Sequence, residues 1–230
     1  MCILCPETPP DKSSSKGGKG QAADKMLSMQ NMPNQFEVNL KDACCKDPLC
    51  CCAGGICAPC GFTACWSRKT VLETLENGVD SFICCQGYVG KCACINPPDC
   101  LPGSPVGLCL EGCCCPVMSI SIARMHLMDK QSIRPDPMDY QIIQCSNFLQ
   151  LLSCICNILA LFVQELREAA AIIECIADIF TLSVAGCMTV QINTQVKKIK
   201  DGGPNVVFAS PVYNKPLGAP PGPAGEEMER

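Results

Sequence analysis

The sequence has little of what catalysis or nucleic-acid binding requires. Aromatic residues make up 5% of the 230 residues, and there is one histidine. The 18 Lys and Arg residues are outnumbered by 22 Asp and Glu, so no basic excess attracts a phosphate backbone. Neither a Gly-x-Gly-x-x-Gly fingerprint nor a phosphate loop ending in Gly-Lys-Ser/Thr occurs. We expect no nucleic-acid partner, no nucleotide chemistry and no enzymatic activity.

A secretion signal is also missing. The chain opens with MCILCPETPP and contains no run of 7 to 15 apolar residues before about Asn39, as a signal peptide would need. No Asn-x-Ser/Thr glycosylation acceptor occurs. We therefore expect a cytosol-facing environment, where thiols stay reduced.

Cysteine, by contrast, is abundant, with 24 residues. Many cysteines are adjacent in sequence, as in Cys50–Cys52 and Cys113–Cys115. Neighbouring side chains diverge, and each would need its own thiol at a Cα separation of about 4.4 to 6.8 Å to form a disulfide. Such runs favour lipidation or packing over a simple set of bridges.

The composition divides the chain into a single domain between two tails. Residues 1–40 are predicted to be a disordered tail, and residues 201–230 a Pro- and Gly-rich tail that could dock a protein partner. Residues 41–200 form the predicted domain, with a Cys-rich part at 41–115 and an apolar helical part at 116–200. The expected fold is mainly α, with an irregular Cys/Gly/Pro-rich half packed against a helical hairpin.

Helix signals are sparse in the first half and strong in the second. Frequent Gly and Pro predict short, loop-joined elements in the first half, with one helix at about 62–76. A proline can occupy a first helical turn, so a helix is expected from Pro116 to about Lys130. The prolines in residues 134–137 then interrupt the chain.

Two long helices are expected after that break. Residues 142–163 carry no charge and would extend about 33 Å, enough to cross a bilayer core of about 30 Å. A second helix is expected at about 165–190, which makes a hairpin the natural geometry. Basic residues flank the pair on the outside, whereas the joint between the helices is acidic. We therefore expect a membrane-associated protein with both termini in the cytoplasm. The alternative is a soluble bundle containing two buried helices.

Both long helices carry a polar stripe at helical spacing. The first stripe comprises Asn147, Gln150, Cys154, Asn157 and Gln164, and the second comprises Arg167, Glu174, Asp178 and Thr181. An aspartate at a membrane helix centre costs about 2.5 to 3.5 kcal/mol, so the stripes should face partners, which leaves a homo-oligomer open. Glu174 and Asp178 could bind a cation, pair with Arg167 or lie on a surface.

The segment Cys51–Cys60, CCAGGICAPC, resembles the signature of the cornifelin and plant cadmium-resistance family, also described as placenta-specific-eight-like. The counterpart of the second family stretch would be residues 111–128, with Cys113–Cys115 and Arg124. The chain departs from the pattern at Ala58 and in the second stretch. The resemblance implies a membrane-associated, non-enzymatic protein linked to metal resistance, organ-size control or ion-channel regulation.

Thiolate metal binding is the alternative function. Cys57-x-x-Cys60 has ordinary zinc spacing and could join Cys92-x-Cys94 or Cys84–Cys85 in a four-thiolate site of a soluble or peripheral protein. The same residues 57–60 resemble a thiol-disulfide motif, but no alternating parallel-sheet pattern surrounds them. His126 lies on an apolar helix and is expected to be a packed or interfacial residue.

The function expected from the sequence is a membrane-bound scaffold or regulatory role. Membrane lipids would be bound by the helical hairpin and by acyl chains on nearby cysteines, since two signals together give stable anchoring. The expected acceptors are Cys113, Cys114 and Cys115, beside an apolar helix. Cys2 and Cys5 are further accessible thiols.

Overall fold

The computed structural model describes Met29 and residues 32–88 and 101–202. Both predicted tails lie largely outside the described residues, as do Cys2, Cys5, Cys92 and Cys94.

The described residues are mostly helical. They form α2 (Leu40–Lys46), α3 (Pro48–Ile56), α4 (Phe62–Leu75), η2 (Gly78–Ser81), η3 (Cys84–Gly87), α5 (Pro105–Cys114), α6 (Pro116–Lys130), α7 (Pro137–Ala160), η5 (Gln164–Leu166) and α8 (Arg167–Lys200). Within these ranges the only β pairing is an isolated bridge between Asn34 and Ile133. The prediction of a mainly α fold is confirmed.

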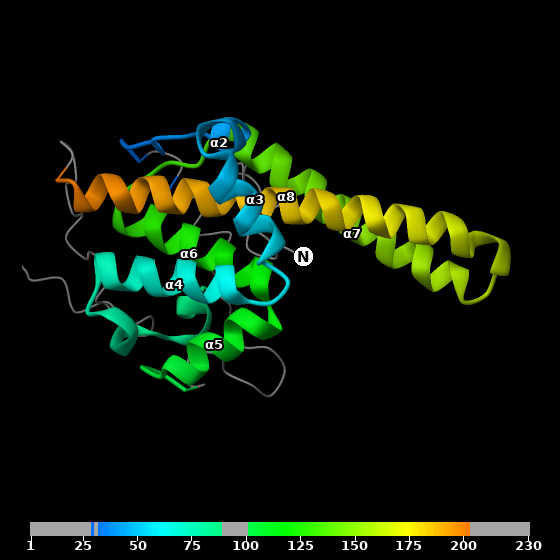
Figure 1. The fold of residues 1–230 in the computed structure, drawn as a ribbon, viewed down its shortest axis with the longest axis horizontal. Coiled ribbons are helices and arrows are strands. Elements are labelled where there is room, and N and C mark those ends of the chain that lie inside the picture. The colour runs from blue at the N-terminus through cyan, green and yellow to red at the C-terminus, as the bar shows by residue number, and fades with distance from the viewer. Residues whose placement is uncertain (1–28, 30–31, 89–100, 203–230) are drawn as a thin grey trace, which may run out of the picture.

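The helices make a compact body from which a long hairpin projects (Figure 1). Helices α7 and α8 lie side by side along the hairpin, and the second half of α8 runs back through the body. There α8 contacts α2 and α3 as well as α4 and α6. One helix therefore belongs both to the projecting hairpin and to the centre of the body.

The helices predicted from clear patterns are present. Helix α4 ends one residue before its predicted end, α6 has the predicted bounds, and α7 begins at the proline that closes the interruption. Helix α8 extends ten residues beyond Val190. Lysines at its last turn suit the negative end of the helix dipole, and its later residues are buried in the body.

Three helices of the Cys-rich half were not expected. Helices α3 and α5 form where Gly and Pro predicted irregular chain, and α2 precedes them. Pro48 and Pro105 occupy first turns, where the missing N–H has no helical partner. Gly54 and Gly55 lie inside α3, at its contact with α8. These glycines serve close helix packing rather than a turn.

Two buried ion pairs link the helices of the body. The Arg68 guanidinium on α4 donates to Glu111 on α5 at 3.1 Å. On α6, Arg124 pairs with Asp139 on α7 and donates to Gln191 on α8 at 2.8 Å. Breaking such a pair leaves an uncompensated buried charge, so these contacts fix how the helices pack.

Candidate functional site

The hairpin exposes apolar side chains on both of its helices. Phe148 is 62% exposed on α7 and Ile172 is 62% exposed on α8, and at the tip Leu161 and Phe162 are 77% and 80% exposed. Single exposed apolar residues are ordinary on a soluble protein, but a contiguous apolar surface marks a protein or membrane contact. By length and composition, α7 and the helical stretch from Gln164 to Lys200 are both able to cross a membrane.

Members of the two predicted polar stripes contact each other across the hairpin, at positions that are mostly exposed. Gln150 on α7 donates to the hydroxyl of Thr181 at 3.0 Å and to the carboxylate of Asp178 at 3.3 Å. Nearer the tip, Asn157 donates to Glu174 at 3.2 Å. Both α8 acids thus contact α7 amides, and hydrogen bonds of this kind are what hold helices together in lipid.

The projecting part of α7 is shorter than the whole helix. Tyr140, Ile143 and Ser146 are buried, and apart from Met138 the exposed large apolar side chains of α7 begin at Phe148. Residues 147–160 would extend about 21 Å at 1.5 Å per residue, against a hydrocarbon core of about 30 Å. A full crossing therefore needs a further contribution from the body surface at the root of the hairpin.

That root surface is made by two turns, the link from α3 to α4 and the link from α5 to α6. The turns touch at Gly61, whose φ is +77° and where an added Cβ would lie 2.8 Å from the Gly112 carbonyl oxygen. Helices α5 and α6 meet there at an angle of 120°. A cavity of about 530 Å³ separates the turns from the hairpin, lined by Pro59, Cys115 and Asp178 among others. The structure thus places both turns at the hairpin root.

Exposed cysteines gather on these turns. We call them the cysteine collar: Cys57, Cys60, Cys113, Cys114 and Cys115. All except the half-buried Cys57 are exposed, and the Cys113 thiol lies 3.9 Å from the Cys60 carbonyl oxygen. The three predicted lipidation residues therefore lie together, accessible, at the base of an apolar hairpin.

Other cysteines of the body are poorer nucleophiles. Burial, aided by the neighbouring Cys109, raises the pKa of the Cys65 thiol to about 11. Burial and the nearby Glu111 carboxylate raise the pKa of Cys85 to about 12. The thiolate is the reactive form, so both thiols are suppressed at neutral pH.

The predicted zinc residues do not converge within the described chain. Cys57 and Cys60 join no group of three ligand atoms there, and Cys92 and Cys94 lie outside the described residues. Cys84 and Cys85 do come close to the carboxylate of Glu111. That carboxylate, however, already accepts from Arg68, from Ser119 at 2.8 Å and from the Cys85 amide at 2.7 Å. The Glu111 carboxylate therefore already links Arg68, Ser119 and the Cys85 amide within the body.

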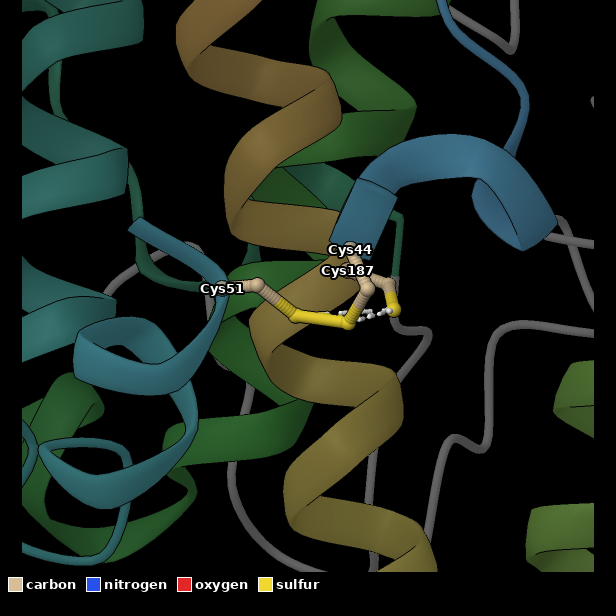
Figure 2. A group of neighbouring side chains, drawn as sticks. All are labelled: Cys44, Cys51 and Cys187. Carbon is tan, nitrogen blue, oxygen red and sulfur yellow. Dashed lines mark hydrogen bonds between the residues drawn. A yellow bond between two sulfur atoms is a disulfide. The ribbon is translucent and has the colours of Figure 1, made fainter. Parts of the chain in front are cut away.

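A third group of thiols was not predicted. Cys44 on α2 and Cys51 on α3 form a disulfide, and the free thiol of Cys187 on α8 approaches both sulfurs (Figure 2). The Cys187 sulfur lies 3.5 Å from that of Cys44 and 3.8 Å from that of Cys51. No spacing rule connects residues 136 and 143 positions apart, so only the fold reveals this group.

The lone histidine is packed, as expected. His126 is 3% exposed, with Nε2 3.2 Å from the Glu76 carboxylate and Nδ1 3.4 Å from the Tyr88 hydroxyl. Burial lowers the pKa of His126. Glu76 also binds Lys130 at 2.8 Å, so the cluster ties α4 to α6.

Comparison with known proteins adds no relative: the chain matches no protein-family model, no curated protein and no solved structure, and its resemblance to the cornifelin family stays a prediction.

Proposed function

We propose that this chain is a membrane-associated, cysteine-rich scaffold or regulatory protein, anchored by the α7–α8 hairpin and by S-acylation at Cys113, Cys114 and Cys115. The observation that carries the proposal is the position of the exposed collar thiols at the root of a projecting hairpin with exposed apolar faces. A single acyl chain anchors weakly, and a second signal, here the inserted hairpin, makes the anchoring stable.

The root surface supplies the length that the free hairpin lacks. Ile56 and Phe62, on either side of the α3–α4 turn, are 77% and 66% exposed. Interfacial apolar side chains of this kind sink about 5 to 10 Å into the boundary between headgroups and acyl chains. Added to the hairpin's free length, this immersion brings its charged tip near the far headgroups.

Charge supports insertion from one side. The body carries Arg124, Lys130 and Arg134 before the hairpin and three lysines at the end of α8, whereas the tip carries Glu165 and Glu168 with Arg167. Basic residues prefer the cytoplasmic side of a membrane. The body and both chain termini would then face the cytoplasm.

Cysteines already present in the chain allow insertion to be tested. Cys154 and Cys175 are exposed on the projecting part of the hairpin, and Cys52 is exposed on the body. In membranes from expressing cells, an impermeant maleimide should label Cys52 at once and the hairpin cysteines only after detergent is added. Equal labelling without detergent, or release of the protein by carbonate, would show that the hairpin does not insert.

Acylation is tested separately by hydroxylamine-dependent exchange on the membrane-bound protein. The triple variant Cys113→Ser/Cys114→Ser/Cys115→Ser should lose most of the exchangeable thioester, whereas Cys45→Ser on the exposed face of α2 should retain it. The hairpin cysteines should stay protected in both variants, which separates loss of acylation from loss of insertion. An unchanged exchange signal in the triple variant would contradict the assignment of these acceptors.

A further inference from the structure

We propose that Cys44, Cys51 and Cys187 form a three-thiolate site for a monovalent soft metal ion, Cu(I), which is closed when the Cys44–Cys51 disulfide is present. The site goes beyond membrane anchoring, and none of its residues belongs to the collar. Its three sulfurs come from three helices, α2, α3 and α8, and point toward one another (Figure 2).

The spacing of the sulfurs suits three-coordinate binding. Three thiolates arranged in a plane at about 2.3 Å from one ion stand about 4 Å apart. The Cys187 sulfur lies 3.5 and 3.8 Å from the other two. Two of the three sulfur–sulfur distances that such a site needs are therefore already present. Reduction of the disulfide lets the Cys44 and Cys51 sulfurs move apart to the third.

The number of ligands favours Cu(I) over zinc. Soft thiolates select both ions, but structural zinc takes four ligands. Within the ranges that the structure describes, no fourth Cys, His, Asp or Glu atom joins this group within 4.8 Å. A three-sulfur set satisfies Cu(I) and leaves zinc one ligand short.

The fold holds the three cysteines in place without the ion. An added Cβ on Gly55 would lie 2.8 Å from the Leu182 carbonyl oxygen, so α3 and α8 are in backbone contact beside the site. The Asp47 carboxylate caps α3 by accepting from the Cys50 amide at 3.0 Å, which fixes α3 against α2. Ligands held this way are pre-organised.

The site has an apolar floor and an open side. Cys51 packs with the buried side chains of Val38, Ala43 and Val190, whereas Cys187 is half-buried. An ion can enter from the open side, and the apolar floor excludes water from the other.

The chemistry balances with a cellular thiol as reductant. Two reductant thiols give two electrons and two protons to the Cys44–Cys51 bond, and are themselves oxidised to a disulfide. The resulting two thiols and Cys187 then release three protons as three thiolates bind one Cu(I). Copper itself is neither oxidised nor reduced in the binding step.

Differential alkylation of the full chain in detergent tests the site. The reduced protein would receive one equivalent of Cu(I) as its acetonitrile complex without oxygen, then iodoacetamide, and each cysteine would be quantified by mass spectrometry. We expect alkylation of Cys44, Cys51 and Cys187 to slow at least tenfold, with Cys52 and Cys60 unaffected. Protection spread evenly over all cysteines, or none at all, would overturn the proposal.

Variants and a change of metal or redox state extend the same alkylation experiment. Cys187→Ser should abolish copper protection of Cys44 and Cys51, whereas the matched control Cys52→Ser, on the same helix as Cys51, should retain it. Should Cys187→Ser fail to fold by circular dichroism, the wild-type pattern alone decides. Equal protection by one equivalent of Zn(II) would refute the assignment to Cu(I), and protection of Cys187 in disulfide-oxidised protein would refute its closure by the disulfide.

Discussion

Gly186 of α8 lies directly against the backbone of Cys51: a Cβ added to this glycine would stand 2.2 Å from the Cys51 carbonyl oxygen. No side chain can occupy that space without moving α3 away from α8. The contact lies one residue before Cys187, so the same close approach that packs the two helices brings their cysteines together.

Replacing Gly186 by alanine should therefore destabilise the protein, although alanine is ordinarily the better residue inside a helix. Overpacking of this kind costs about 1 to 3 kcal/mol. Denaturant unfolding in detergent micelles, followed by the fluorescence of the single tryptophan, Trp66, measures the loss. Ser183→Ala, at an exposed position on the same helix, is the control and should change stability by less than about 0.5 kcal/mol.

Local sequence patterns predicted the helix starts and the hairpin. Pro116, the break at residues 134–137 and the uncharged run from Ile142 mark helix starts and a hairpin, and all three are present. The pattern failed at Gly54 and Gly55, which are turn signals locally but lie inside α3. They are there because α3 lies against α8, more than 120 residues further along the chain: Gly54 meets the Thr189 side chain and Gly55 the Leu182 backbone. No local signal encodes that contact.

The candidate sites likewise fall into those that the sequence pattern predicts and one that only the fold brings together. The collar could be predicted in part, because Cys113–Cys115 adjoin an apolar helix in sequence. Spacing suggested zinc ligands at Cys57 and Cys84, which share no group of three ligand atoms within the described residues. The group around Cys187 could not be predicted, because its members come from three helices whose packing depends on glycine contacts.

Removing the buried carboxylate of Asp139 should strongly destabilise the protein. Asp139 accepts from the Leu40 amide at 3.0 Å and from Gln191 at 3.1 Å, and pairs with Arg124. Asp139→Ala leaves the arginine buried without its counter-charge, at a cost of about 3 to 5 kcal/mol. Denaturant unfolding in detergent micelles, followed by Trp66 fluorescence, measures this loss.

Asp136→Ala is the matched control for that change. Asp136 lies three residues earlier and only caps α7, by accepting from the Met138 amide at 2.8 Å. Loss of such a cap costs about 1 kcal/mol. Equal losses in the two variants would mean that the buried pair contributes no more than a surface cap.

Acid should destabilise the body in two steps. Burial lowers the pKa of His126 below that of the unfolded chain, so stability starts to fall as pH drops below about 6.5. The hydrogen bond with His126, supported by Lys130, lowers the pKa of Glu76 from 4.5 to about 2. The Glu76 contribution is complete above pH 4.5 and is lost between pH 4.5 and about 2.

Unfolding midpoints measured from pH 8 to pH 2.5 would resolve the two steps. Glu76→Gln should reduce the loss of stability below pH 4.5, because the carboxylate with the lowered pKa is gone. Glu73→Gln removes an exposed acid that pairs with Lys69 on the same helix, at 3.7 Å, and should leave the profile unchanged. A pH profile that Glu76→Gln leaves unaltered would show that other groups cause the acid sensitivity.

The hydrogen bonds between the side chains of α7 and α8 should stabilise the hairpin more than apolar packing at the same position would. Gln150→Leu removes the donor to both Thr181 and Asp178 and leaves the aspartate without its α7 partner. Interhelical hydrogen bonds in membranes contribute about 0.6 kcal/mol on average and up to about 1.7, so we expect a loss of about 1 kcal/mol. Unfolding in mixed micelles of increasing dodecyl sulfate content measures it. Gln144→Leu, at an exposed position on the same helix, should have little effect. If Gln150→Leu instead stabilises the hairpin, its two helices are held by apolar contact, and Asp178 does not need the amide.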